Sequence, residues 1–287
     1  MLYHAFPDLQ WLKKQAESRF ASGKAWNGEQ VPTGGWPNVL LNVKTSSTVR
    51  DNIPGPLSLF SNVSGASLVM VDGRTTIVND DYFFISNNTQ RYTLEVKSAE
   101  IFNIHFGENW LKNIIDVQDI EFYNKLYRKD EVVRYLQAQL RLPDKTTLER
   151  EELLTRLIVY LLRVKRNEKI VLENLDATKP ATREEILRRL HLATDYIYSY
   201  YDNDLSLDEL AKISMMSKFH FLRAFRQAFG VAPHKFLTKV RIDKAKGLLQ
   251  SNLEVAKIGK IVGISDASSF SRLFKNETGV YPTQFRK

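Results

Sequence analysis

The spacing of hydrophobic positions changes part-way along this chain of 287 residues. Between Ser67 and Phe106, apolar and polar residues alternate in short runs, which is the period of β-strands. Two of these runs flank Asp72-Gly73, a residue pair typical of a two-residue hairpin turn. We therefore expect several short antiparallel strands that form a small barrel or sandwich.

Helical spacing follows the strands. It predicts one helix in Asp119–Arg141 and a second in Thr146–Lys165, where Thr146 and Glu149 form a capping box. The second helix carries an apolar stripe wider than one face resting on a sheet requires. The stripe packs in the chain's own core, or part of it is a dimer seam. The candidates for that seam are Leu154, Leu157, Ile158 and Leu161.

Two domains follow from this pattern. Residues 1–166 form a β-rich domain with two helices, residues 167–181 read as a linker, and residues 182–287 are helical throughout. The fold class is therefore α+β. Within the last part, Thr182 with Glu185 and Ser206 with Glu209 predict two further helix starts.

The C-terminal domain contains an internal repeat. One set of residues recurs at an offset of 49. The first copy has Phe221, Arg223, Phe225, Gly230 and Pro233, and the second copy has Phe270, Arg272, Phe274, Gly279 and Pro282. Upstream, an offset of 48 relates Ala211 and Ser217 to Gly259 and Ser265. Each copy thus has a short helix with a small residue, a turn, a serine N-cap and a second helix that buries two phenylalanines. A glycine C-cap and a proline follow it. Each copy is a predicted helix-turn-helix unit.

Charge points to the same region. The net charge is +8, yet residues 1–177 hold 22 Lys+Arg against 22 Asp+Glu, whereas residues 178–287 hold 19 against 11. A localised positive field attracts the phosphate backbone of DNA, although charge alone also fits a basic, inert surface.

Composition narrows the setting. The absence of cysteine excludes disulfides and thiolate metal sites. The sequence has no signal-peptide pattern and no apolar run near the ~18 residues of a membrane helix, so we expect a cytoplasmic protein without membrane contact.

From about Thr182 to Lys287 the sequence resembles the DNA-binding domain of the AraC/XylS transcription regulators. The resemblance rests on Leu207-x-x-Leu210-Ala211, Ser217-x-x-x-Phe221-x-Arg223-x-Phe225, Gly230-Val231-x-Pro233, Arg241-Ile242-x-x-Ala245, Gly263-Ile264-Ser265-Asp266 and Ser269-Phe270-Ser271-Arg272. It implies seven helices, with two recognition helices in successive major grooves of double-stranded DNA. A central helix, here 234–250, holds them about one DNA turn apart.

By position, the resemblance implies roles for individual side chains. Arg223 and Arg272 would bind guanine through paired hydrogen bonds. The residues facing bases are Phe219, Leu222, Arg223, Ser268, Ser271 and Arg272, and those facing phosphate are Ser217, Lys218, Arg226, Lys235 and Lys275. The second copy departs from the family at Gly259-Lys260, and its 267–269 segment lacks long side chains, so we expect it to discriminate bases less strongly.

The resemblance also implies tasks for the N-terminal half: a cupin-like barrel that binds a small effector and dimerises through its helices. It implies a homodimer that activates transcription through RNA polymerase. The pocket residues are unknown: Trp26, Trp36 and Tyr82 could stack on a ligand, but aromatic side chains at such positions more often belong to the core.

Other functions remain as alternatives. A metal cupin enzyme needs two or three histidines plus a carboxylate, and this half has only His4 and His105, so we expect no catalysis, metal or cofactor. A repressor, or an architectural protein without an effector, also fits. The architectural protein would show shallow sequence preference and steep salt dependence.

Overall fold

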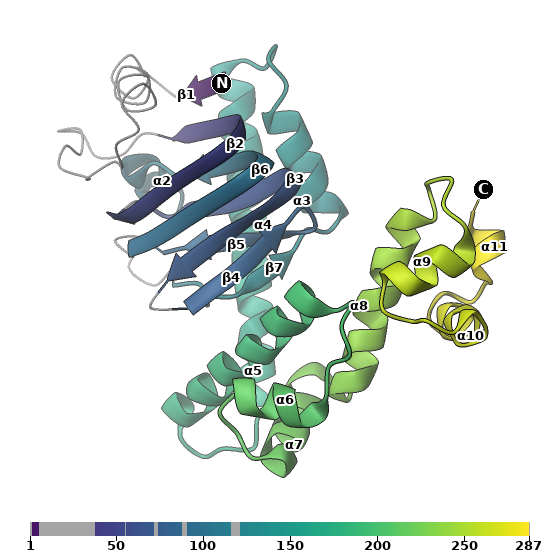
Figure 1. Ribbon diagram of the computed structural model, residues 1–287. Coiled ribbons are helices and arrows are strands. Elements are labelled where there is room, and N and C mark those ends of the chain that lie inside the picture. The colour runs from purple at the N-terminus through teal and green to yellow at the C-terminus, as the bar shows by residue number, and fades with distance from the viewer. Residues whose placement is uncertain are drawn as a thin grey trace. The chain divides into compact units, whose positions relative to one another are not determined.

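The computed structural model describes residues 2–5, 38–54, 56–71, 74–87, 91–115 and 121–286. The chain divides into two compact units, Met1–Asn167 and Glu168–Lys287. The first contains an antiparallel sheet and the second is helical (Figure 1), so the predicted α+β class is confirmed.

The described part of the first unit is built on one sheet. Its strands are β1 (Leu2–Ala5), β2 (Val39–Pro54), β3 (Ser58–Val71), β4 (Arg74–Asn79), β5 (Tyr82–Ser86), β6 (Arg91–His105) and β7 (Leu126–Arg128). They pair antiparallel in the order β1-β2-β6-β3-β5-β7, and β4 pairs with β3. Within the described residues the sheet does not close, so the barrel is not confirmed.

The first predicted hairpin is present. Val71 lies opposite Arg74 in the β3–β4 pair, the register that a two-residue turn requires. Asp72 and Gly73 themselves lie outside the described residues.

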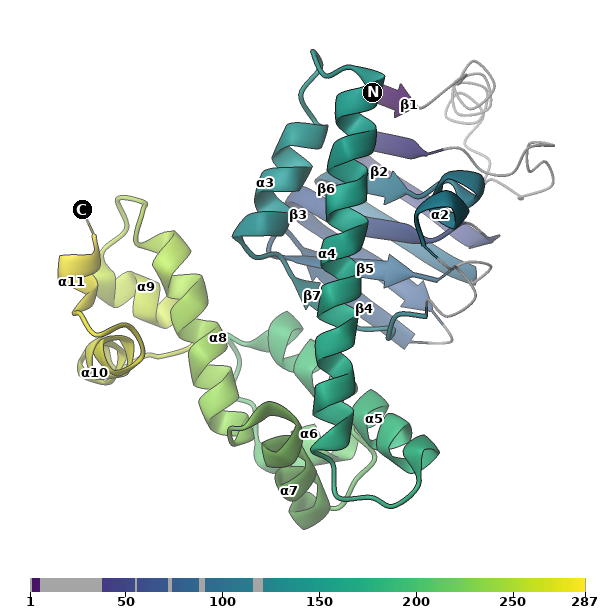
Figure 2. The ribbon, with the colours of Figure 1, turned by 180° about the vertical axis from the view of Figure 1, so that it is seen from behind.

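Within the described residues, three helices accompany the sheet: α2 (Glu108–Ile114), α3 (Glu131–Leu140) and α4 (Thr147–Glu173). Figure 2 shows α3 and α4 side by side across one face of the sheet. The predicted helix 119–141 is wrong in its first part, because Leu126 and Tyr127 belong to β7 and pair with β5. Helix α3 begins later, where the Asp130 side chain accepts a hydrogen bond from the Val133 amide at 3.0 Å. Pairing along the sheet edge overrides the local helical spacing.

The predicted dimer seam also needs correction. Leu154, Leu157, Ile158 and Leu161 are at most 1% exposed within the single chain. They belong to one core cluster with residues of the sheet, which include Leu40, Leu59, Phe83 and Phe102. Because this stripe is already covered by the chain's own sheet, it offers no surface to a partner.

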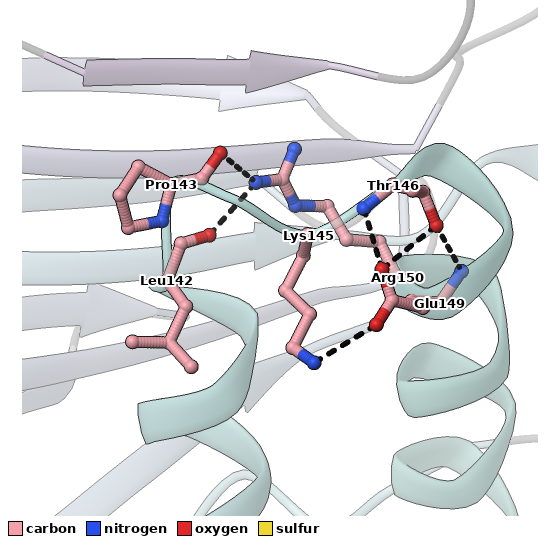
Figure 3. A network of polar contacts seen from close by, with 6 residues as sticks. All are labelled: Leu142, Pro143, Lys145, Thr146, Glu149 and Arg150. Atoms are coloured by element: carbon pink, nitrogen blue, oxygen red, sulfur yellow. Dashed lines mark hydrogen bonds and ion pairs between the residues drawn. The ribbon is translucent and has the colours of Figure 1, made fainter.

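The capping box that starts α4 is confirmed (Figure 3). The Thr146 hydroxyl accepts from the Glu149 amide at 3.2 Å, and the Glu149 carboxylate accepts from the Thr146 amide at 2.8 Å. The hydrogen bond from the Thr146 amide, with Lys145 nearby, lowers the pKa of Glu149 to about 2. Arg150 donates to the carbonyls of Leu142 at 2.8 Å and Pro143 at 3.3 Å, which ties α4 to the end of α3.

The segment expected to be the linker is mostly helical. Helix α4 continues to Glu173 and the next helix begins at Pro180, so only 174–179 separate them. Pro180 occupies the first turn, where its missing amide hydrogen costs nothing. The predicted Thr182–Glu185 box is therefore absent, and Glu185 instead pairs with Arg188 at 2.8 Å and Arg189 at 2.7 Å.

After the end of α4, the described part of the second unit consists of seven helices, the number that the resemblance implied. They are α5 (Pro180–Tyr200), α6 (Leu207–Ile213), α7 (Lys218–Phe229), α8 (Pro233–Leu248), α9 (Val255–Ile261), α10 (Ala267–Thr278) and α11 (Pro282–Phe285). Helix α8 runs from the group α5–α7 to the group α9–α11 (Figure 1).

The candidate ligand and metal residues of the N-terminal half are accounted for in part. Tyr82 is 3% exposed and belongs to the core, while Trp26 and Trp36 lie outside the described residues. His105 shares a hydrogen bond of 2.7 Å with the Ser58 hydroxyl. Among the described residues there is no group of three or more side chains suited to a metal ion, and no helix long and apolar enough to cross a membrane.

Candidate nucleic-acid interface

The two repeat copies form two helix-turn-helix units, α6–α7 and α9–α10. Each second helix buries its pair of phenylalanines completely, with Phe221 and Phe225 in α7 and Phe270 and Phe274 in α10. Because these residues are four apart, they occupy one face of each helix and leave the opposite face to solvent.

A small residue allows the helices of each unit to approach closely. Ala211 in α6 is 3% exposed. A Cβ atom on Gly259 in α9 would lie 3.0 Å from the Ile264 carbonyl oxygen and 3.1 Å from Cγ of Phe270. The predicted close passage is thus seen at Gly259, and Ala211 is buried at the corresponding position of the first copy.

The C-terminal ends of α7 and α10 follow the prediction, whereas their N-terminal ends differ from it. Gly230 and Gly279 have φ of 71° and 83° and end α7 and α10 in the left-handed conformation. Ser217 precedes α7 without a side-chain capping bond. The second copy differs, because Asp266 and not Ser265 caps α10 by accepting from the Ser269 amide at 2.6 Å. Two hydrogen bonds from Ser269, one from its side chain and one from its amide, lower the pKa of Asp266.

The solvent face of α7 carries a large aromatic side chain that nothing in the described chain covers. Phe219 is 86% exposed, and the side chain of Arg223, four residues on, is 63% exposed. Leu222 is half-buried between them. An exposed phenylalanine of this size forgoes roughly 1.5–3 kcal/mol of burial. Its place beside an arginine on a helix of this type marks a contact surface for another molecule.

Two acidic residues meet the basic groups of this face. Lys218 is 2.8 Å from the carboxylate of Asp208 in α6, and Arg223 is 3.9 Å from that of Asp176 in the 174–179 connection. The Asp176 amide also lies 3.4 Å from the Gln227 side-chain oxygen. Arg226 is exposed on the same helix. Sequence spacing contains no signal for the Asp176 contact, since the partners lie far apart along the chain.

The corresponding face of α10 is smaller and less positive. Ser268 and Arg272 are exposed and Ser271 is half-buried. Arg272 lies 3.3 Å from the Ser269 hydroxyl, close to the cap residue Asp266. Lys275 lies 4.4 Å from the centroid of the Tyr281 ring, a cation–π contact.

The predicted contact residues lie on α7 and α10, except Ser217, which precedes α7, and Lys235, which lies in the first turn of α8. Those expected to meet phosphate are all exposed: Ser217, Lys218, Arg226, Lys235 and Lys275.

The family of this region follows from its sequence. Residues 210–287 match the family model described as a helix-turn-helix domain. The C-terminal part of this chain is therefore similar to AraC-type helix-turn-helix domains. An uncharacterized HTH-type transcriptional regulator of Haemophilus influenzae is 39% identical over 101 residues, which are 35% of this chain and 34% of that protein.

Similarity to some proteins extends beyond the AraC-type domain. An uncharacterized HTH-type transcriptional regulator of Staphylococcus aureus (strain COL) is 24% identical over 258 residues, 86% of this chain and 33% of that protein. The chain thus spans about a third of the length of these relatives. The C-terminal domain of AraT, a response regulator from Geobacillus stearothermophilus, is similar with 32% identity and a TM-score of 0.33 over 34% of this chain and 83% of that one.

Proposed function

We propose that this chain is a sequence-specific DNA-binding transcription regulator that reads two successive major grooves with α7 and α10. The observation that carries the proposal is the exposed pair Phe219 and Arg223 on a helix whose other face is fully buried. An arginine on such a helix matches the O6 and N7 acceptors of guanine, and a phenylalanine matches the thymine methyl group. The AraC-type family of the domain supports the same function.

The residues divide by task. Arg223 and Arg272 read guanine, while Phe219, Leu222, Ser268 and Ser271 contact neighbouring base edges. Ser217, Lys218, Arg226, Lys235 and Lys275 bind phosphates and set the register. Lys218 and Arg223 exchange their carboxylate partners, Asp208 and Asp176, for DNA when it binds.

The experiment is in vitro selection of random duplex DNA by the full chain at near-physiological salt. The expected product is two short boxes about one helical turn apart. Arg223→Ala should lose about 1–3 kcal/mol of discrimination at one base position, or about 5- to 150-fold. The matched control, Arg226→Ala, should weaken all sequences alike and lower the salt dependence by about one counterion. Equal losses of selectivity in Arg223→Ala and Arg272→Ala would contradict the weaker reading assigned to the second copy.

The competing DNA-binding function, an architectural protein, is separated by the same experiment. It predicts that no motif is enriched and that affinity falls steeply with salt for every sequence. The exposed aromatic at Phe219 favours base reading, because phosphate binding needs no such side chain.

The N-terminal unit is part of the proposal as a dimerisation and effector domain, which makes the protein a cytoplasmic, effector-responsive activator that contacts RNA polymerase. A repressor remains the second candidate. Transcription in vitro from a promoter that carries the selected boxes, with purified RNA polymerase, separates activation from repression.

The dimer surface, displaced from the buried stripe, is the groove between α3 and α4. Val132, Tyr135 and Val159 line it and are 45%, 57% and 37% exposed. Glu131 and Arg163, of opposite charge, also line it, which suits a self-complementary interface between two copies. Tyr135→Asp should yield a monomer in sedimentation, with its circular dichroism unchanged because the side chain is exposed. A folded dimer would place the interface elsewhere.

A further inference from the structure

The spacing between the two helix-turn-helix units is held by more than helix α8. At about 1.5 Å per residue, the 16 residues of α8 span about 24 Å. Its first half packs on the first helix-turn-helix unit (α6–α7) through Phe236, whose ring centroid is 5.5 Å from that of Phe225. Its second half carries Ile242 and Ala245, which lie with Leu249, directly after α8, in the core of the second helix-turn-helix unit (α9–α10). A helix that joins two bodies fixes their separation along its axis, but their relative rotation also depends on the side-chain contacts that each body makes with the helix.

A second connection lies beside it. The loop 201–203, directly after α5, accepts hydrogen bonds from the Arg241 side chain of α8. The Arg241 Nε and Nη2 atoms donate to the carbonyl oxygens of Tyr201 and Asn203, each at 2.7 Å. Burial lowers the pKa of Arg241. The side chain is thus a fork that holds two backbone carbonyls of one loop.

The same loop also contacts the second helix-turn-helix unit directly. Tyr201 packs against the core cluster that contains Phe270 and Phe274. A Cβ atom on Gly263, in the turn between α9 and α10, would lie 2.5 Å from the Asp202 carbonyl oxygen. Only glycine permits this approach, and its φ of 80° is also a conformation that other residues rarely adopt.

Helix α5, which directly precedes the loop, packs on the first helix-turn-helix unit, since it contacts α6 and α7. The loop therefore joins the first helix-turn-helix unit to the second independently of the connection through α8. We infer that Arg241 and the loop 201–203 form a brace that fixes the rotation of one recognition helix relative to the other. The brace thereby sets which spacing between the two DNA boxes the protein accepts.

The physical reason is the geometry of DNA. One base pair of added spacing moves the second box by about 3.4 Å and turns it by about a tenth of a helical turn. A rigid pair of reading helices rejects such a change, whereas a flexible pair follows it. Arg241 is in this sense a positioning residue: it touches no DNA in the proposed complex.

The first test needs no DNA. The chain contains no cysteine, so spin labels attach only to introduced ones. His220→Cys on α7 and Ala267→Cys on α10, both exposed, report the distance between the recognition helices by electron–electron double resonance. In the Arg241→Ala background we expect the distance distribution to widen about twofold, because both carbonyl contacts are lost. Arg188→Ala removes the same charge from an exposed ion pair on α5 and should leave the width unchanged.

The second test measures the consequence on DNA and rests on the proposed function. Duplexes carry the two selected boxes at the optimal spacing or with one or two base pairs added or removed. The unlabelled full chain should lose tenfold or more in affinity per step, about the cost of one lost base contact. In Arg241→Ala this preference should fall several-fold, with lower affinity at the optimum. Arg241→Lys, which keeps the charge but loses the fork, should lie between the two, and it carries the test if the alanine variant does not fold.

The outcomes separate the two proposals. If the protein selects no pair of boxes, the proposed function fails, and the label distances still decide whether the brace exists. If folded Arg241 variants keep the narrow distance distribution and the same spacing preference, α8 alone sets the geometry and the brace is refuted.

Discussion

Lys129 is a buried cation in the sheet domain, and its environment makes the stability of this domain depend on pH. The residue is 5% exposed, and its ammonium group donates to the Asn62 carbonyl oxygen at 2.6 Å. Burial, with a smaller contribution from Arg134, lowers the pKa of Lys129 from 10.5 to about 8. The charged form is therefore less stable in the folded chain than in the unfolded chain.

The sign and size follow from linkage. Between pH 8 and 10.5 the unfolded chain binds more protons at this site than the folded chain, so the free energy of unfolding rises with pH in this window. Below pH 8 the destabilisation is complete. A shift from 10.5 to about 8 corresponds to about 3 kcal/mol. In Lys129→Met this contribution disappears, while the Asn62 carbonyl loses its partner at a cost of about 1–3 kcal/mol at every pH.

The pH slope is therefore the informative quantity, and the absolute stability is not. We expect the wild-type free energy of unfolding to rise by about 3 kcal/mol relative to Lys129→Met between pH 7.5 and 10.5. Urea unfolding followed by tryptophan fluorescence measures it in the right unit, since all four tryptophans precede Leu111. Lys112→Met removes an exposed charge and should keep the wild-type slope. Parallel curves for the wild type and Lys129→Met would refute the reasoning, since they would mean that the charged amine is not desolvated.

Three further predictions concern single positions. Met215 has a φ of 52° at the turn where the second copy has Gly263, a conformation that strains a residue with a Cβ atom. Met215→Gly should therefore stabilise the helical unit by about 0.5–1 kcal/mol in thermal unfolding. A loss of stability would contradict the backbone strain assigned to Met215. Gly259→Ala should destabilise the same unit by about 1–2 kcal/mol despite the better helix propensity of alanine, because the added Cβ would lie 3.0 Å from the Ile264 carbonyl oxygen and 3.1 Å from Cγ of Phe270. An increase in melting temperature would show that these neighbours move aside. Leu157→Asp should abolish the cooperative fluorescence transition of the sheet unit rather than produce a folded monomer, because Leu157 is fully buried, and a folded monomer would restore the seam first assigned to it.

Features that depend on neighbouring residues were predictable. The left-handed glycines Gly230 and Gly279 and the Thr146–Glu149 capping box depend on interactions within one turn or one helix. The repeat, with its offsets of 48 and 49, is visible because such local features recur along the sequence. The exposed face of α7 was predictable for the same reason, since Phe221 and Phe225 at a spacing of four define its opposite.

Tertiary structure decided what local spacing left open. The leucine stripe of α4 fits a core or a seam equally well, and only the sheet beneath it made it a core. Leu126 and Tyr127 became strand because the edge of β5 offered unpaired backbone groups. The contacts of Arg223 with Asp176 and of Arg241 with the loop 201–203 join residues about 40 or more positions apart. A sequence pattern reports which side of an element is apolar, whereas the partner of that side depends on how the whole chain folds back on itself.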